Sequence, residues 1–99
     1  MKQMTRVFQA LADPTRRQIL QELKGGELAA GDIAARFPIS APAVSRHLSI
    51  LDVAGLIEGR REGNRILYSL CADALAGSLN DFLSAVCPTQ IVHRRRRKS

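Results

Sequence analysis

The sequence has 99 residues, of which 45% are apolar and 24% charged, the composition of one globular domain with its own hydrophobic core. We expect neither a membrane span, which needs roughly 18 apolar residues in a row, nor a secretory signal, and two cysteines then predict a cytoplasmic protein with reduced thiols. The formal net charge of +6 falls mostly on residues 94–98 (RRRRK), because without these five the chain has ten basic against nine acidic side chains, or +1.

An amphipathic helix is predicted at the start of the chain, because apolar residues recur there at the spacing i, i+3, i+4, i+7. Its apolar stripe consists of Met4, Val7, Phe8 and Leu11. A second helix is predicted from Pro14 to about Lys24. Asp13 is a good N-cap for it, Pro14 suits the first helical position, and Gly25 with Gly26 ends it.

A helix-turn-helix unit follows. Its first helix is expected over residues 30–37, where Ala29 is a poor N-cap and Pro38 stops the helix. Its second helix begins after Ser40, a strong N-cap, and continues to about Ala54. The buried row of this second helix consists of Val44, Leu48 and Leu51.

The hydrophobic period then changes from that of a helix to that of a strand. Residues 56–61 and 65–70 are predicted as a β-hairpin around a turn at residues 62–64. A last helix is expected over residues 72–86. The chain is therefore expected to be mainly α with a β-hairpin wing, in the order α-α-α-α-β-β-α, as one domain over residues 1–88. A basic, disordered tail is expected over residues 89–99; it either adds non-specific DNA affinity or is a solvated segment without a role.

A helix-turn-helix followed by a hairpin is the order of a winged helix-turn-helix, whose second helix enters the major groove of double-stranded DNA. The outward positions of that helix are small or hydrogen-bonding: Ala41, Pro42, Ser45, Arg46 and Ser49. Arg46 is a long donor that can read guanine or hold a phosphate. The hairpin adds Arg60, Arg61 and Arg65, partly offset by Glu58 and Glu62. Alone, a hairpin with ordinary surface charge pairs explains these arginines equally well; joined to the helix-turn-helix, they favour DNA binding.

Five blocks of the chain resemble, in the same order, the ArsR/SmtB family of bacterial winged-helix repressors. The blocks are FQALADPTRRQIL at 8–20, AGDIA at 30–34, SAPAVSRHLSIL at 40–51, AGLI at 54–57 and REGNRILYSL at 61–70. The resemblance is greatest to the short members that lack metal sites. It implies a homodimer, built on the first and last helices, that represses transcription from an inverted-repeat operator.

The resemblance also implies which residues touch DNA and which touch the second subunit. DNA contacts are implied for the wing arginines and for Ala41, Val44, Ser45 and Arg46; Ser40 and His47 complete the predicted set. A glutamine is common in the family where this chain has Ala41, so the resemblance implies that one base contact is absent here and leaves the operator sequence open. The predicted dimer interface consists of Met4, Val7, Phe8, Leu11, Leu75, Leu79, Phe82, Leu83 and Val86. These stripes hold more large apolar residues than one small domain needs, although packing within one monomer is the alternative.

Metal sensing at the family's known sites is not expected. Residues 27–32 (ELAAGD) contain no thiol, and the last helix carries Asp73 and Asp81 but no histidine, whereas zinc prefers cysteine and histidine ligands. His47 is expected to pack or bond at the junction of helix and hairpin. The chain also lacks GxSxG, HExxH and a phosphate-binding glycine loop, so we predict no enzymatic activity, no catalytic residue and no cofactor.

Two alternatives stay open. Cys71 and Cys87 flank the last helix, which at 1.5 Å per residue separates them by ~24 Å, too far for a disulfide within one chain. If the last helices of a dimer run antiparallel, as the resemblance implies, Cys71 of one subunit approaches Cys87 of the other, and the pair is a candidate redox switch. The second alternative is a winged helix that binds proteins. It predicts weak DNA association that does not depend on salt, whereas a repressor loses affinity steeply as salt rises.

Overall fold

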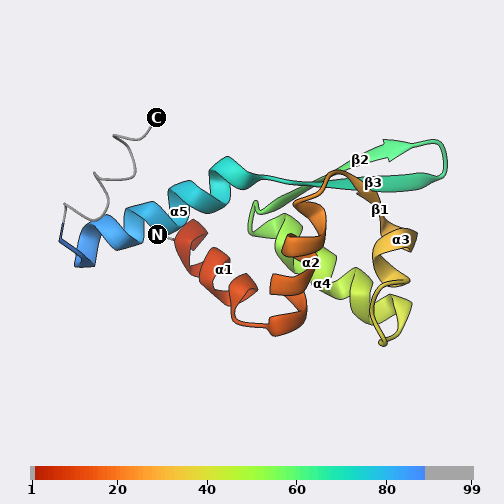
Figure 1. Ribbon diagram of the computed structural model, residues 1–99, viewed down its shortest axis with the longest axis horizontal. Helices are drawn as coiled ribbons and strands as arrows, with labels where there is room; N and C mark the ends of the chain where they lie inside the picture. The colour runs from red at the N-terminus through yellow and green to blue at the C-terminus, as the bar shows by residue number, and fades with distance from the viewer. Residues whose placement is uncertain (1, 89–99) are drawn as a thin grey trace.

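The computed structural model describes residues 2–88, and Figure 1 shows how its helices and strands are arranged. The helices are α1 (Lys2–Leu11), α2 (Pro14–Leu23), α3 (Ala30–Ala34), α4 (Ala41–Val53) and α5 (Ala72–Val86). The strands are β1 (Leu28–Ala29), β2 (Ile57–Glu62) and β3 (Arg65–Leu70). The predicted winged helix-turn-helix is confirmed. The predicted tail, residues 89–99, lies outside the described residues.

The sheet contains one strand that the sequence analysis missed. All three strands are antiparallel in the order β1-β3-β2, and β1 pairs Leu28 with Tyr68 and Ala29 with Leu67. A strand of two residues is too short to show any periodicity. The first strand of the hairpin begins and ends one residue later than predicted, while the second has the predicted bounds. Glu62 therefore pairs with Arg65, and only two residues form the turn. Of these two, Gly63 alone has a positive φ, +65°, which favours glycine there.

The N-terminal ends of α2 and α4 form as their sequences predict. Asp13 Oδ2 accepts a hydrogen bond from the Arg16 amide at 3.1 Å, and Ser40 Oγ accepts one from the Ala43 amide at 3.2 Å. Each cap satisfies a backbone donor that has no partner inside the helix.

Helix α3 is shorter than predicted and ends at Ala34 instead of residue 37. Beyond Ala34 the chain continues in tighter turns, in which the Arg36 amide donates to the Ile33 carbonyl and the Phe37 amide to the Ala34 carbonyl. Phe37 precedes Pro38, and the proline ring disfavours the α conformation of the residue before it. The α-helix itself thus ends before the residue that Pro38 restricts, and the intervening residues adopt the tighter turns.

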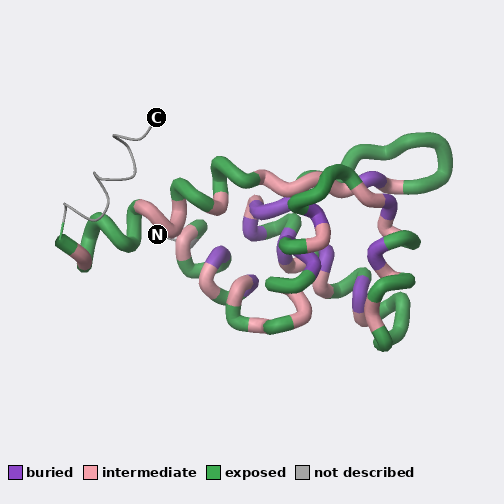
Figure 2. The backbone as a smooth tube through the Cα atoms, viewed as in Figure 1, coloured by how far each residue is buried: buried purple, intermediate pink, exposed green. Residues whose placement is uncertain are grey.

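The hydrophobic core lies where α2, α3 and α4 meet the sheet, and Figure 2 shows the buried segments gathered there. Helix α4 contributes Val44, Leu48 and Leu51, as predicted. Helix α5 extends away from this body, at the end opposite to the hairpin (Figure 1), and contains no buried residue. Over residues 2–88, no helix is long and apolar enough to cross a membrane. The fold thus presents two features to the outside: the outer side of α4 with the wing, and the apolar face of α5.

Candidate nucleic-acid interface

The outer side of α4 carries an exposed row of small and hydrogen-bonding side chains. The row consists of Ala41, Pro42, Ser45, Arg46 and Ser49. Ser40, just before the helix, is also exposed, and its hydroxyl oxygen is engaged in the cap. Most of the predicted contacts of this helix therefore lie on its accessible side, where small residues let a base edge approach closely.

Val44 was predicted both as a core residue and as a DNA contact, and the second prediction is wrong. Its side chain is only 1% exposed and packs in the core with Leu48 and Leu51. The four-residue spacing between Val44 and Leu48 places both on the same inward side of α4. A residue so placed supports the helix without reaching a ligand.

Within residues 2–88, two of the predicted DNA-contacting arginines have unoccupied guanidinium groups, as does Arg6 of α1, which was not among the predicted contacts. Across the described residues, Arg46 on α4 and Arg61 on β2 take part in neither a side-chain hydrogen bond nor an ion pair, and both are exposed. Such groups can donate to a phosphate, or in two parallel bonds to guanine, without first breaking a protein contact.

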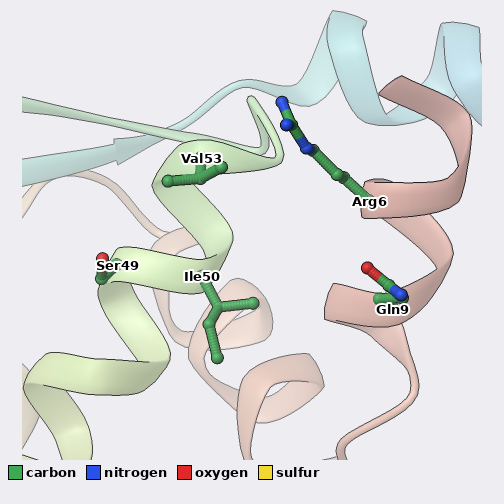
Figure 3. A pocket seen from close by; sticks show the side chains of 5 residues that line it. All are labelled: Arg6, Gln9, Ser49, Ile50 and Val53. Carbon is green, nitrogen blue, oxygen red and sulfur yellow. The ribbon is translucent and has the colours of Figure 1, made fainter. Parts of the chain in front are cut away.

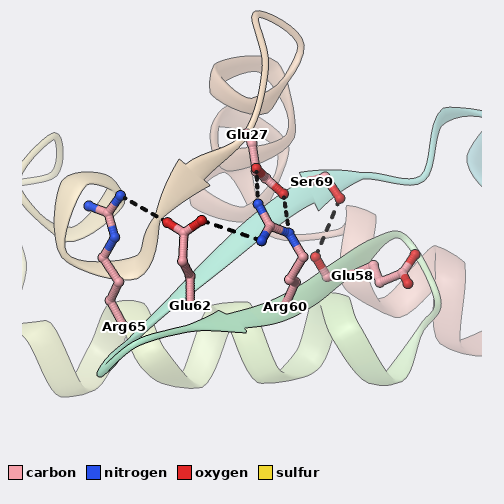
Figure 4. A network of polar contacts seen from close by, with 6 residues as sticks. All are labelled: Glu27, Glu58, Arg60, Glu62, Arg65 and Ser69. Atoms are coloured by element: carbon pink, nitrogen blue, oxygen red, sulfur yellow. Dashed lines mark hydrogen bonds and ion pairs between the residues drawn. The ribbon is translucent and has the colours of Figure 1, made fainter.

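The other two wing arginines are already paired with carboxylates, as Figure 4 shows. Arg60 donates through Nη2 to Glu27 Oε1 at 2.8 Å and through Nε to Glu27 Oε2 at 3.3 Å. Glu62 lies between Arg60 and Arg65, at 3.5 Å from one and 3.4 Å from the other. The hydrogen bond to Glu27 raises the pKa of the Arg60 guanidinium above its already high value. The wing is thus less basic than its composition indicates.

The register of the hairpin separates Arg61 from Arg60. Adjacent residues of a strand point to opposite faces of the sheet, so Arg61 shares a face with Gly59 and with their cross-strand partners Ile66 and Tyr68. Tyr68 packs against the core, and burial together with the charge of Asp52 on α4 raises its pKa. Arg61 therefore lies on the sheet face that is turned towards α4.

His47 is turned inwards rather than towards the outer row. Its Nδ1 lies 3.2 Å from Arg16 Nη1 and 3.9 Å from Asp13 Oδ2, and its side chain is 19% exposed. Its predicted place at the junction of helix and hairpin is wrong, because it contacts the start of α2 instead. His47 was also predicted as a DNA contact, but its Nδ1 atom already contacts Arg16 within the protein.

The predicted dimer residues divide into a buried and an exposed group. Val7 is 1% exposed and belongs to the core, so its assignment to an interface was wrong. Phe8 of α1 packs edge-on against Phe82 of α5, with ring centroids 5.2 Å apart. The exposed part of the stripe consists of Phe82 (42%), Leu83 (42%) and Val86 (63%). Met4, Leu11, Leu75 and Leu79 are half-buried, and Leu11 and Leu75 pack against the core.

The two cysteines are free and half-buried. Helix α5 runs unbroken between Cys71 and Cys87, which excludes a disulfide within the chain. Burial, followed by the charges of Glu58 and Asp52, raises the pKa of the Cys71 thiol. Between residues 2 and 88 no three or more His, Cys, Asp or Glu side chains group in a way that could hold a metal ion.

Comparison with known proteins identifies relatives of this arrangement. The family model described as "Bacterial regulatory protein, arsR family" matches residues 13–59, from the N-cap of α2 into β2. The transcriptional repressor SdpR of Bacillus subtilis is 49% identical over 83 residues, which cover 84% of this chain and 92% of the relative. The HTH-type transcriptional regulator Rv2034 of Mycobacterium tuberculosis is 46% identical over 76 residues, 77% of this chain and 71% of the relative.

Solved structures agree with these relatives. An ArsR-like transcriptional regulator from Rhodococcus superposes with a TM-score of 0.76 at 31% identity, covering 98% of this chain and 89% of the other. The homodimeric winged helix-turn-helix DNA-binding domain of a possible ArsR-family regulator from Mycobacterium bovis superposes with a TM-score of 0.70 at 33% identity, covering 98% and 83%.

Proposed function

The chain belongs to the ArsR family of bacterial regulatory proteins, and from this premise we propose that it is a homodimeric transcriptional repressor that binds an inverted-repeat operator without requiring a metal. Members of the family are DNA-binding transcriptional regulators rather than enzymes, in agreement with the sequence analysis. The relatives named above include a repressor and a homodimeric domain.

The observation that carries the proposal is the free guanidinium of Arg46 on the accessible side of α4. Around it stand small residues that allow a close approach to base edges, and Arg61 lies on the sheet face turned towards the same helix. Arg46 is therefore the residue to read a base or grip a phosphate in each half-site, and Arg61 adds a phosphate contact from the wing.

The apolar face of α5 supports the proposal that the protein is a homodimer. A helix of 15 residues without a single buried side chain is unusual in a monomer, because the C-terminal part of its apolar stripe stays exposed to water. A two-fold axis that pairs this face with its copy covers Phe82, Leu83 and Val86 on both subunits. Two recognition helices then meet half-sites about 34–36 Å apart, one turn of DNA.

Selection of bound sites from random duplex DNA tests the proposal. We expect a symmetric sequence with two half-sites about one helical turn apart, bound equally with added zinc and with a chelator. A winged helix that serves only as a protein-binding module would select no sequence, and its weak association with DNA would not change with salt. A selected site bound only with metal present would contradict metal independence.

A further inference from the structure

Helix α1 is tied to α4 by polar contacts at both of its ends. Near the N-terminal end, the side-chain amide of Gln3 donates to the carbonyl of Ala54, which caps the C-terminal end of α4. Gly55 follows with φ +80°, and a Cβ there would lie 3.0 Å from the Gln3 amide nitrogen. At the C-terminal end, the tie is made by Arg16, the third residue of α2.

The guanidinium of Arg16 holds α1 and α4 at the same time. Its Nε donates to the carbonyl of Ala10 at 2.8 Å and its Nη2 to that of Gln9 at 2.9 Å, which satisfies two carbonyls of the last turn of α1. Its Nη1 lies 3.2 Å from Nδ1 of His47 on α4. One planar group therefore fixes the end of α1 against the middle of the recognition helix.

Between these two ties the two helices meet in the core, and on the outer side of that contact they leave an open groove. Figure 3 shows this groove, with Arg6 and Gln9 of α1 on one side and Ser49, Ile50 and Val53 of α4 on the other. Below the groove, Val7 and Ala10 bury α1 in the core, but apolar contacts have no preferred direction. The directional contacts at the two ends thus determine how α1 is rotated against α4.

The contact requires one particular form of His47. A guanidinium only donates hydrogen bonds, so Nδ1 must accept, and the proton of the neutral ring then sits on Nε2. Asp13 Oδ2, at 3.9 Å from Nδ1, is too distant for a hydrogen bond. Arg16 and Asp13 are the charged groups within the described residues that contact His47, and the bond to Arg16 is the shorter of the two.

We infer that Arg16 and His47 are positioning residues that set the spacing of the half-sites which the dimer accepts. The inference rests on the proposed function, in which α1 and α5 belong to the dimer interface and α4 reads DNA. In a two-fold dimer, a rotation of α4 against α1 moves both recognition helices in opposite directions. The separation of the helices, and with it the preferred spacing of half-sites, then depends on the contact that fixes this rotation.

The test uses the selected operator, with base pairs added or removed between its half-sites. The wild-type protein is expected to prefer one spacing. His47→Leu replaces the ring with an apolar side chain of similar size and removes the acceptor. Arg16→Lys keeps the charge but cannot reach all three acceptors at once. In each variant the preference for the best spacing falls about tenfold, the value of a lost hydrogen bond to a charged donor. His47→Asn, which retains an acceptor near the position of Nδ1, is expected to keep the preference.

Two controls separate positioning from general effects. Circular dichroism and thermal unfolding verify that each variant is folded, and the salt dependence of binding should be unchanged in Arg16→Lys because its charge remains. If folded His47→Leu and Arg16→Lys variants rank the spacings as the wild type does, even with uniformly weaker binding, the inference is wrong. If instead the wild-type protein binds no duplex with preference, the proposed function itself fails.

Discussion

Glu27 holds the guanidinium of Arg60 through both carboxylate oxygens, although 33 positions separate the two residues in the chain. The pair joins the segment before β1 to the wing, and it leaves Arg61, one position further on, as the wing arginine without a partner among the described residues. Adjacent arginines on one strand therefore have different roles.

This difference predicts the outcome of a matched pair of substitutions. Arg61→Ala should weaken binding to every duplex and reduce the slope of log affinity against log salt by about 1, the effect of one lost phosphate contact. Arg60→Ala should change the slope less, because Glu27 already neutralises this charge. Fluorescence anisotropy titrations at several salt concentrations measure both slopes. Equal effects of the two substitutions would show that DNA displaces Glu27 and engages both arginines.

If the exposed apolar stripe of α5 forms the dimer interface, a polar substitution in it should give a monomer. Leu83→Asp places a charge on the apolar face that is left uncovered in one chain, so the dimer should dissociate while the core, which lies in other elements, stays intact. Analytical ultracentrifugation measures the mass of the particle in solution. We expect operator binding to weaken when the dimer dissociates. Ser84→Asp, an exposed neighbour pointing to another side of the helix, is the control and should remain dimeric. A dimeric Leu83→Asp variant would place the interface elsewhere.

The environment of the Asp13 carboxyl predicts that the free energy of unfolding falls at acid pH. The hydrogen bond from the Arg16 backbone amide first, and then the charge of the Arg16 guanidinium, lower the pKa of this carboxyl in the folded chain. A lowered pKa contributes stability that is present above the ordinary value of about 3.9 and is lost as the pH falls through the lower, folded value. Urea unfolding of the wild type and of Asp13→Asn, which keeps an acceptor for the cap, should converge as the pH falls through this range. Curves that stay parallel down to the lowest pH would show that the carboxylate charge adds nothing.

The pair of Cys71 and Cys87 across the subunits is the open alternative, and the environment of Cys71 disfavours it. The thiolate is the reactive form of a cysteine, and burial together with the charges of Glu58 and Asp52 raises the pKa of the Cys71 thiol, which makes Cys71 a poorer nucleophile for forming a disulfide. After mild peroxide, non-reducing gels should show no linked dimer, and operator binding should persist. A linked band that disappears in Cys87→Ser would establish the cross-subunit pair instead.

The sequence predicted those features that depend on neighbouring residues. The caps at Asp13 and Ser40, the turn at Gly63 and the bounds of α5 are local signals, and the structure confirms them. The pairing of Glu27 with Arg60 joins distant segments, and no local pattern indicates it.

Val7 and Val44 illustrate a second limit. An apolar stripe on a helix has the same spacing whether it faces the core of its own chain or another molecule, so only the packing of the whole fold places these two residues inside. The inward turn of His47 likewise follows from how α2 crosses α4, which the sequence of α4 alone does not specify.

The most direct measurement of the central claim is a titration of the selected operator with the wild-type protein and with Arg46→Ala. We predict two chains per duplex, an affinity that falls steeply with salt, and a loss of ~1–3 kcal/mol in the variant if Arg46 reads a base. Lys24→Ala, which removes a positive charge beyond the end of α2, is the control and should bind like the wild type. One chain per duplex, or unchanged binding by Arg46→Ala, would contradict recognition by paired copies of α4.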